Sequence, residues 1–533
     1  MAKVQTRSIS RSIQNGRLGS ANGLRKRPGP GGQVGLKIIQ KGKKKFFEKV
    51  NPATLDILGV YPLCEAAEVD HALDAARHGF ERWSKLSLRE RSKHLKRFRK
   101  QLVKDMNEIV DTICQECGKT EMDAMIEVMV VCEHMKYVEQ KGPHFLRDEK
   151  RSTGIFVIKG AYVSFHPKGV VGVISPWNYP LVLSMGPITQ ALMAGNSVVL
   201  KPSEVTPKTS MKIAEIAYRA GIPQDVLQVI TGDGSTGALL VESPKTDMIC
   251  FTGSTATGRK IGEVCGRLLK PVILELGGKA PMLVFDDANL KRAVSGALWG
   301  GLSNSGQTCI TIDRVFVHES IFDKFIELAT VELAHIRQGL RHEMPSIGSM
   351  TFPRQIEIVG DQVTDAIQRG ARIISGGKKN TSYAGHFYEP TIVTNHTPDF
   401  RIMREETFGP VINVLPFRTE EEAVKLANDT VYGLNAYVWT RDKKRARRVA
   451  RQIRSGNLNI NDVYVNYFMS DLPFGGVKSS GIGRVYAIEG LRAFADQQSV
   501  CYDRLGLNKD PYWFPYTPAK QGLIYRATKL LFG

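Results

Sequence analysis

The chain has 533 residues, of which 42% are hydrophobic and 24% charged, and its formal net charge at pH 7 is +20. The length predicts two to four domains of roughly 100–200 residues each, with ample surface to bury a large core. No uninterrupted apolar run approaches the roughly 18 residues that cross a bilayer, and no apolar stretch follows the N-terminus, so the sequence argues against a membrane-spanning protein and a secretory signal.

The positive charge is concentrated near the N-terminus, where residues 1–50 hold 13 Lys and Arg and a single acidic residue, Glu48. Residues 1–45 also lack hydrophobic periodicity, so we predict a basic disordered arm there. Three roles stay open for it: a solvated segment, an organelle transit peptide, or an arm that binds anionic lipid or nucleic acid. We expect no specific nucleic-acid partner from charge alone.

The next residues predict a hairpin and then helices, which continue to about residue 140. Two strand-like segments follow, and strands then alternate with helices as far as residue 277. The alternation repeats over 281–480 with different sequences. Strands separated by helices of this length predict parallel sheets, and hence two α/β domains.

The C-terminal segment predicts a helix with one apolar stripe. The stripe consists of Leu523, Ile524, Ala527, Leu530 and Leu531, and the basic residues off it are Lys520, Arg526 and Lys529. We expect this helix to dock on the protein's own surface. The alternative is a basic amphipathic contact with a membrane, made through the termini.

Eight cysteines are scattered along the chain, unlike the dense framework of a secreted mini-domain, so we expect a reducing, cytoplasmic location. Cys114 and Cys117 form a C-x-x-C pair, but no second pair follows at zinc-site spacing, and we expect no metal site. Cys309 lies in GLSNSGQTCIT, among Gly, Ser, Asn, Gln and Thr, and is the candidate nucleophile. Cys250, in MICFTGS, fits a buried structural thiol.

Seven short motifs occur in order along the chain: ISPWNYPL (174–181), VVLKPSE (198–204), FTGST (251–255), LELGGKAP (274–281), SNSGQTC (303–309), EETFGPV (405–411) and LPFGGVKSSGIGR (472–484). Together they resemble the aldehyde dehydrogenase superfamily over about residues 50–505. The resemblance implies that family's α/β fold and an NAD(P)-dependent oxidation of aldehydes. The parts that it implies are a Rossmann-like cofactor domain (46–150 and 168–277), an α/β catalytic domain (278–489) and a small oligomerisation β-extension (151–167 and 490–507). A C-terminal tail (508–533) extends past the family's usual last strand.

The resemblance assigns three catalytic roles that the chemistry requires. Cys309 supplies a thiolate that adds to the aldehyde, because a trigonal aldehyde does not readily release hydride whereas a tetrahedral thiohemiacetal does. Asn178 and the Cys309 backbone N–H stabilise the oxyanion. Glu275, at a predicted strand end before two glycines, activates the water that hydrolyses the thioester.

Further residues of the motifs are implied cofactor contacts. Lys201, Ser203 and Glu204 come from KPSE, and the Glu204 carboxylate favours NAD because it accepts from ribose hydroxyls and repels a 2′-phosphate. NADP remains an alternative. Gly253 and Ser254 lie in a turn between a strand and a helix, where exposed N–H groups favour a phosphate. The implied contacts on the nicotinamide side are Trp177, Glu406 and Phe408.

Substrate preference is expected to lie in the loop before LPFGG, which reads NDVYVNYFMSD and contains no Lys or Arg. The candidate substrate residues are Tyr464, Tyr467, Phe468 and Phe474. An acidic aldehyde calls for a cation at this position, so we favour apolar or aromatic aldehydes. The alternative is succinate semialdehyde, since CITIDRVFV resembles the second type of bacterial succinate-semialdehyde dehydrogenase. A non-catalytic structural protein on this fold is a third alternative.

Two predicted strands bear on assembly. AYVSFHP and DQQSVCYDR resemble the family's projecting oligomerisation hairpin and the strand that pairs with it. An exposed edge strand is prone to aggregation unless it is paired. We therefore expect a homodimer or a dimer of dimers.

Overall fold

The computed structural model describes residues 37–42 and 44–533. Its first sheet is antiparallel and contains β1 (Ile38–Lys41), β2 (Lys44–Val50) and β3 (Ile57–Pro62). Two of these strands begin inside the segment 1–45 that we predicted to be a disordered arm, so residue 45 is too late a limit for it. Pairing of Ile38 with Phe47 explains the difference, because the apolar residues of KIIQKGKKKFFEKV meet in a hairpin. The rest of the predicted arm lies outside the described residues.

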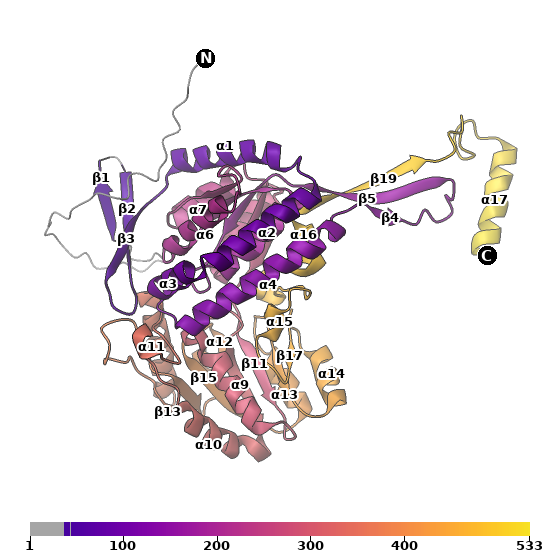
Figure 1. Cartoon of the computed structure of the whole chain (residues 1–533). Helices are drawn as coiled ribbons and strands as arrows, with labels where there is room; N and C mark the ends of the chain where they lie inside the picture. Colours follow the sequence, from indigo (N-terminus) through magenta and orange to yellow (C-terminus); the bar gives the residue numbers. More distant parts are fainter. Residues whose placement is uncertain (1–36, 43) are drawn as a thin grey trace. The chain divides into compact units, whose positions relative to one another are not determined.

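Four helices follow: α1 (Ala66–Trp83), α2 (Leu88–Lys104), α3 (Met106–Cys117) and α4 (Glu121–Phe145). Helix α2 begins where the Ser87 side chain accepts a hydrogen bond from the Glu90 N–H, and α3 ends at Gly118 in the left-handed conformation. Figure 1 shows α2 and α4 running beside each other, as their packing contacts require. Cys114 and Cys117 are free thiols buried in α3.

The next sheet has six strands in the order β18-β10-β9-β6-β7-β8. Its strands are β6 (Val170–Ile174), β7 (Ser197–Lys201), β8 (Leu227–Val229), β9 (Met248–Thr252), β10 (Val272–Glu275) and β18 (Gly481–Ile482), and the connecting helices are α5 (Val182–Ala194), α6 (Pro207–Arg219), α7 (Gly234–Glu242) and α8 (Thr255–Arg267). All pairs are parallel except β10–β18. The chain proceeds from β6 to β8 in one direction and returns to β9 on the other side of β6. Such a reversal opens a crevice at the carboxyl ends of the strands.

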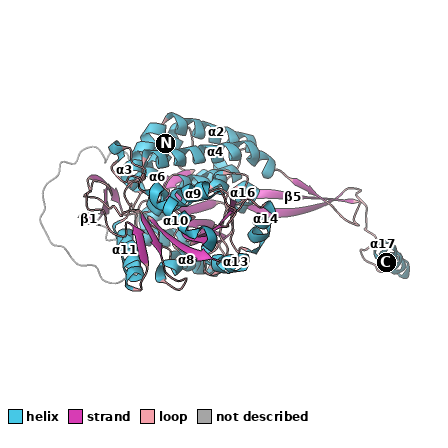
Figure 2. Cartoon of the chain, turned by 90° about the horizontal axis from the view of Figure 1, so that it is seen from below, coloured by secondary structure: helices cyan, strands magenta, loops and turns pink. Residues whose placement is uncertain are grey.

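The largest sheet has seven strands in the order β13-β14-β15-β12-β11-β16-β17. They are β11 (Ala280–Val284), β12 (Ile312–His318), β13 (Arg372–Ser375), β14 (Thr391–Thr394), β15 (Val411–Phe417), β16 (Tyr437–Trp439) and β17 (Asn459–Ile460). Its helical segments are α9 (Leu290–Leu302), η2 (Ser303–Gly306), η3 (Glu319–Ile321), α10 (Phe322–Leu333), η4 (Arg341–Glu343), α11 (Pro353–Gln368), α12 (Arg401–Arg404), α13 (Glu420–Asn428), α14 (Lys443–Gln452), α15 (Val465–Phe468) and η5 (Lys478–Ser480). Figure 2 shows strands of the sheets among helices. The expected α/β class is confirmed, and each of the two large sheets is parallel except for one antiparallel edge pair, β10–β18 in one and β13–β14 in the other.

The last sheet is antiparallel, with β19 (Ala495–Asp503), β5 (Lys159–Pro167) and β4 (Glu149–Arg151) in that order. Nine residues of β19 pair with nine of β5, from Ala495 opposite Pro167 to Asp503 opposite Lys159. Helix α16 (Ala487–Ala493) leads into β19 and packs on α4 and α5. These are the two strands that the sequence indicated for oligomerisation.

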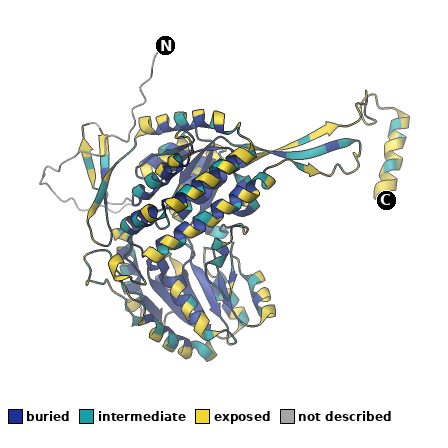
Figure 3. Ribbon diagram, in the orientation of Figure 1, coloured by how far each residue is buried: buried dark blue, intermediate teal, exposed yellow. Residues whose placement is uncertain are grey.

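The chain ends in α17 (Pro518–Phe532), the helix that we predicted from the C-terminal stripe. The expectation that it docks on the protein's own surface is wrong for the described residues, because each α17 residue is exposed or half-buried there. Figure 3 shows the contrast between the buried strands of the sheets and the mostly exposed residues of α17. A stripe predicts which face of a helix is apolar, but it does not predict what covers that face.

Candidate active site

The crevice of the six-stranded sheet gathers most of the predicted residues. Lys201 ends β7, Gly253 and Ser254 follow β9, and Glu275 ends β10, so three parallel strands of this sheet deliver them to the same edge. The loop after β6, the strand at the centre of this arrangement, carries Trp177 and Asn178. The parallel alignment of the four strands therefore explains why motifs far apart in sequence meet.

Cys309 lies in a loop between α9 and β12, and the backbone of that loop is unusual. Asn304, Ser305 and Gly306 all have positive φ angles, between 51° and 70°. A Cβ on Gly306 would lie 2.0 Å from the Gly409 carbonyl oxygen, and a Cβ on Gly278 would lie 2.1 Å from the Cys309 carbonyl oxygen. Glycine is required at both positions, because the loop is held close to two other segments of backbone.

The Asn178 side chain is buried beside this loop. Its Nδ2 donates to the Gln307 carbonyl oxygen at 3.0 Å. Its own backbone carbonyl accepts from Lys119 Nζ at 2.8 Å and from Asn304 Nδ2 at 3.0 Å. These bonds hold the amide that we predicted as oxyanion donor against the loop of Cys309.

Lys119 belongs to a buried ion pair that the sequence did not indicate. Its Nζ lies 2.9 Å from a carboxylate oxygen of Glu127, and both side chains are fully buried. It also lies 4.1 Å from the ring centroid of Tyr179. Burial lowers the pKa of Lys119, but the Glu127 carboxylate outweighs it and the pKa is raised, so the ammonium stays charged. The other Glu127 oxygen accepts from the N–H groups of Leu181 and Val182.

Glu275 is buried and isolated. Its two carboxyl oxygens have no hydrogen-bond partner among residues 37–42 and 44–533. Burial raises the pKa of Glu275 well above its ordinary value, and the positive charge of Arg484 offsets this only in part. Its surroundings therefore favour the protonated form more than those of an exposed glutamate do.

Cys309 is partly exposed, in contrast to Cys250, which is buried as expected. Burial raises the pKa of the Cys309 thiol, and the carboxyl groups of Glu406 and Glu275 raise it further. The backbone N–H groups of Cys309 and Ile310 act in the opposite direction. These surroundings therefore favour the thiol over the thiolate.

Glu406 and Phe408 lie on the other side of the crevice, in the loop before β15. Glu406 Oε1 accepts from the Gly278 N–H at 2.9 Å, and burial raises the pKa of Glu406 to about 7. The Phe408 backbone has a positive φ of 52°. The Phe408 ring packs edge-on against the Trp177 ring, with ring centroids 5.4 Å apart. Phe352, which no sequence motif indicated, also packs on Trp177, with ring centroids 6.2 Å apart.

The polar residues after β7 and β9 form the remaining part of the crevice. Lys201 Nζ lies 3.5 Å from a carboxylate oxygen of Glu204, and burial lowers the pKa of Lys201. Ser203 Oγ accepts from the Val205 N–H. Ser254 caps α8, because its Oγ accepts a hydrogen bond from the Thr257 N–H. Gly253, just before Ser254, lies close to the Phe251 ring, and a Cβ there would be 2.5 Å from that ring. The start of α8 thus faces the crevice with first-turn N–H groups.

A pocket of about 640 Å³, open solvent included, leads to Cys309. Its lining includes three of the four predicted substrate residues, Tyr464, Tyr467 and Phe468. Besides Cys309, the other residues that line it are Asp123, Ile126, Glu127, Val130, Tyr179, Val182, Leu183, Trp299, Ser303, Thr308 and Ile310. Of the described residues that line it, none is Lys or Arg.

Phe474, the fourth predicted substrate residue, is not part of this lining. It is buried behind Tyr467, with the two rings edge-on at 4.7 Å. The α4 residues, by contrast, were missed. The spacing of residues 123, 126, 127 and 130 places them on one face of a helix. It does not distinguish a face that lines a pocket from a face that packs in the core, because both have this spacing.

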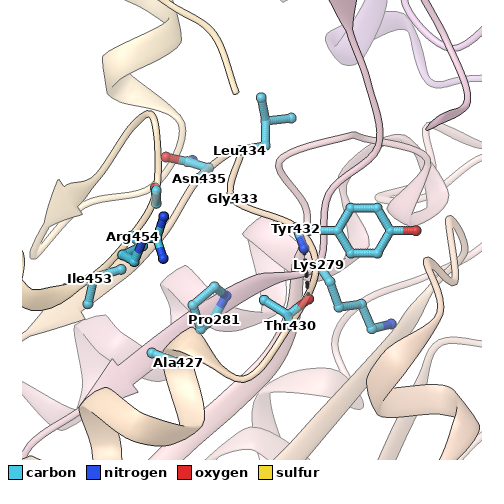
Figure 4. Close-up of a pocket in the computed structure, with 11 residues that line it drawn as sticks. Lys279, Pro281, Ala427, Thr430, Tyr432, Gly433, Leu434, Asn435, Ile453 and Arg454 are labelled. Carbon is cyan, nitrogen blue, oxygen red and sulfur yellow. Dashed lines mark hydrogen bonds between the residues drawn. The ribbon is translucent and has the colours of Figure 1, made fainter. Parts of the chain in front are cut away.

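Figure 4 shows a second pocket, of about 220 Å³, lined by Lys279, Pro281, Tyr432, Leu434 and Arg454 among others. Lys279 forms a buried ion pair with Asp313 at 3.0 Å, on the side of the large sheet. None of the predicted site residues lines this pocket. In the described part of the chain, no group of three or more His, Cys, Asp or Glu is placed to hold a metal ion.

Comparisons with known proteins agree with this geometry. Residues 38–500 match the model of the aldehyde dehydrogenase family. The chain is 39% identical over 471 residues to a 4,4′-diapolycopene aldehyde oxidase from Methylomonas sp., with 88% of each chain covered. It is 35% identical over 481 residues to a mitochondrial succinate-semialdehyde dehydrogenase from Oryza sativa subsp. japonica, with 89% of each covered.

Among solved structures, an NAD-dependent aldehyde dehydrogenase from Sinorhizobium meliloti superposes with a TM-score of 0.83 at 36% identity. The match covers 88% of this chain and 93% of that one. The fold of this chain is thus that of a solved aldehyde dehydrogenase.

Proposed function

The chain belongs to the aldehyde dehydrogenase family and is NAD(P)-dependent, and from this premise we propose that it oxidises an apolar or aromatic aldehyde to a carboxylic acid through a thioester on Cys309. The observation that carries the substrate class is the pocket at Cys309, whose described lining is mostly aromatic and aliphatic, carries the two acidic side chains of Asp123 and Glu127, and contains no cation. The catalytic roles are supported by two relations to the Cys309 loop: Asn178 donates to the Gln307 carbonyl there, and Glu275 is near enough to raise the pKa of the Cys309 thiol.

The first step is addition of the Cys309 thiolate to the aldehyde carbon. A C–S bond forms, and the carbonyl oxygen becomes an oxyanion. Asn178 Nδ2, which donates to the Gln307 carbonyl at rest, is the donor placed to turn toward that oxygen, together with the Cys309 N–H. Because Lys119 and Asn304 hold the Asn178 backbone, only its side chain has to move.

The last step is hydrolysis of the thioester. Glu275 has two carboxyl oxygens unused by the described protein, so once ionised it can accept a proton from water. The hydroxide formed attacks the thioester carbon, the C–S bond breaks, and the acid leaves while Cys309 regains its thiolate. Since burial raises the pKa of Glu275, its ionised form is scarce at low pH and increases as the pH rises.

The crevice fits a nicotinamide dinucleotide. We propose that Lys201, Ser203 and Glu204 hold a ribose of this group. Gly253, Ser254 and the start of α8 hold the pyrophosphate. Trp177, Glu406 and Phe408 surround the nicotinamide end. When bound, this group accepts the hydride that leaves the aldehyde carbon. The Glu204 carboxylate favours NAD, with NADP as the alternative.

Succinate semialdehyde is the second candidate substrate, because a relative at 35% identity carries that activity in its name. Its carboxylate would need a cation at the pocket, and none of the described lining residues supplies one. The first relative, named for a diapolycopene aldehyde, supports the apolar class instead.

Initial rates on a panel of aldehydes, with NAD and NADP in parallel, test both assignments. We expect kcat/KM to be higher for long aliphatic and aromatic aldehydes than for succinate semialdehyde, and Cys309→Ala to abolish activity without loss of fold. A kcat/KM for succinate semialdehyde above that for every apolar aldehyde would overturn the substrate proposal. Activity of Cys309→Ala within tenfold of the wild type would overturn the mechanism.

We further propose a cytoplasmic protein that assembles as a homodimer or a dimer of dimers. Support for assembly comes from β19, whose outer edge has no partner strand in the described part of the chain. An organelle-targeting role for the N-terminal arm remains an alternative that falls outside the described residues. Among those residues, no helix is long and apolar enough to cross a membrane.

A further inference from the structure

The C-terminal segment presents a large exposed apolar surface that the proposed function does not use. We refer to it as the C-terminal surface, and it consists of Trp513, Phe514, Tyr516, Leu523, Ile524, Tyr525, Leu530, Leu531 and Phe532, each about half or more exposed. Exposed apolar patches of this extent mark a binding surface. Leu530 alone is 86% exposed.

A second exposed apolar group lies beside the start of this segment. Residues 155–157, in the loop between β4 and β5, read Ile-Phe-Val, and all three are exposed. The Phe156 ring packs on Tyr512 with centroids 5.7 Å apart, and the Arg504 N–H donates to the Ile158 carbonyl. Lys159 fixes the junction by pairing with Asp510 at 2.7 Å. The base of the C-terminal segment is therefore anchored to the β4–β5 loop rather than free.

The charge of the segment has one sign. Residues 511–533 contain Lys520, Arg526 and Lys529 and no acidic residue. Asp510, just before them, is buried and already paired with Lys159. In α17, Arg526 and Lys529 lie off the apolar stripe Leu523, Ile524, Ala527, Leu530 and Leu531, whereas Lys520 lies on the stripe's face in the first turn. Residues 511–533 supply no acidic partner for these cations. Thr517 caps α17 and Pro518 begins it, so the helix is defined by local signals without a packed face.

Two occupants fit an apolar face, and charge distinguishes them. A second copy of the chain would present the same three cations, on a protein whose net charge is already +20. An anionic bilayer presents the opposite charge over a wide area, and aromatic residues such as Trp513 and Tyr516 suit its interface. With 15 residues, α17 is too short to span the hydrocarbon but long enough to lie in the interface plane.

We propose that the C-terminal surface docks the protein on anionic lipid bilayers, with α17 in the plane of the membrane and its Leu and Ile side chains in the acyl boundary. The contact is peripheral and reversible, and it stands independently of the catalytic mechanism. It would place the enzyme where apolar aldehydes accumulate.

Co-sedimentation of the full-length protein with vesicles tests this proposal. The vesicles are phosphatidylcholine alone, or phosphatidylcholine with phosphatidylglycerol. The test variant is Leu523→Glu/Leu530→Glu, which places two anions in the stripe. The control is Leu269→Glu, because Leu269 is 91% exposed in a loop after α8, outside the C-terminal surface. All three proteins keep the N-terminal arm, so its contribution cancels.

We expect binding to the anionic vesicles to fall at least about tenfold in the double variant and to stay within about twofold of wild type in Leu269→Glu, while dehydrogenase activity in lipid-free buffer is unchanged in both. We also expect wild-type binding to weaken with added salt and to be lower on phosphatidylcholine alone. Equal vesicle binding by wild type and double variant would overturn the proposal. So would a halved particle mass of the double variant in lipid-free buffer, which would assign this surface to a second copy of the chain.

Discussion

At the residue scale, Glu275 has the most informative surroundings. Neither oxygen of its buried carboxyl group has a hydrogen-bond partner in the described part of the chain, so the group can accept a proton from water once it is ionised. In Glu275→Gln, we expect thioester formation to survive, because addition and oxidation do not use the hydrolytic water. NADH should then appear as a burst of up to about one equivalent per active site, followed by slow turnover. Stopped-flow absorbance measures the burst, and intact mass spectrometry locates the acyl group on Cys309. A burst and steady state both unchanged would contradict the assignment.

The raised pKa of Glu275 also predicts a pH dependence. The carboxylate exists only above its raised pKa, so kcat for a substrate limited by hydrolysis should increase as the pH rises through that value. In Glu275→Gln, the residual steady-state rate should lose this rising limb. Profiles of kcat against pH for the two proteins provide the measurement, and identical profiles would exclude Glu275 as the titrating base.

Lys119 is a positioning residue, because it acts through the Asn178 carbonyl rather than on substrate. Lys119→Met removes that bond and leaves Glu127 buried without its partner, which costs about 3–5 kcal/mol of stability in comparable pairs. Lys119→Met/Glu127→Gln avoids the uncompensated charge. In this double variant, we expect kcat to fall about 10-fold to 100-fold with KM changed less.

The check on Lys119 is its dependence on Asn178. In an Asn178→Ala background, where the oxyanion donor is already lost, Lys119→Met/Glu127→Gln should reduce kcat by less than about threefold. A full additional loss would show that Lys119 contributes to catalysis by another route, or only to stability. Circular dichroism and thermal unfolding of each variant separate an effect on stability from an effect on kcat.

At the scale of elements, the turn after β10 controls the loop that carries Cys309. Gly278→Ala would place a Cβ 2.1 Å from the Cys309 carbonyl oxygen, so the loop must shift, and we expect a loss of about 1–3 kcal/mol together with reduced kcat. The matched control is Gly266→Ala in α8, where a Cβ meets nothing within 4 Å among the described residues. That change should raise the midpoint of thermal unfolding slightly, since Ala stabilises a helix relative to Gly.

The elements also show what the sequence could and could not predict. Strands and helices from 170 to 275 follow from alternating apolar runs and turns, and the motifs identify Glu275 and Cys309 because their chemistry needs those residue types. The α4 face at Ile126 and Val130 was missed, since a substrate-lining face and a core-facing face have the same spacing. Phe474 was assigned to the substrate pocket because loop position does not determine which way a side chain points, and it packs behind Tyr467.

At the scale of the whole molecule, β19 is an edge strand of nine residues whose side chains are mostly exposed. Unpaired edges of this length associate with another chain. We therefore predict a homodimer or a dimer of dimers, measured by multi-angle light scattering at micromolar concentration in lipid-free buffer. Pro replacements at Ser499 and Cys501, which remove two N–H donors, should lower the mass. A monomeric wild type would refute the prediction.

The position of β18 has a consequence for how the molecule is made. This strand comes from residues 481–482, yet it closes the edge of the sheet whose other strands lie between 170 and 275, pairing Gly481 with Glu275 itself. During translation, the six-stranded sheet cannot be completed until about nine-tenths of the chain has left the ribosome. Long-range pairing of this kind slows folding and leaves apolar surface open to aggregation or chaperones in the meantime. Glu275, the base that we propose for hydrolysis, therefore acquires its final surroundings only when synthesis is nearly over.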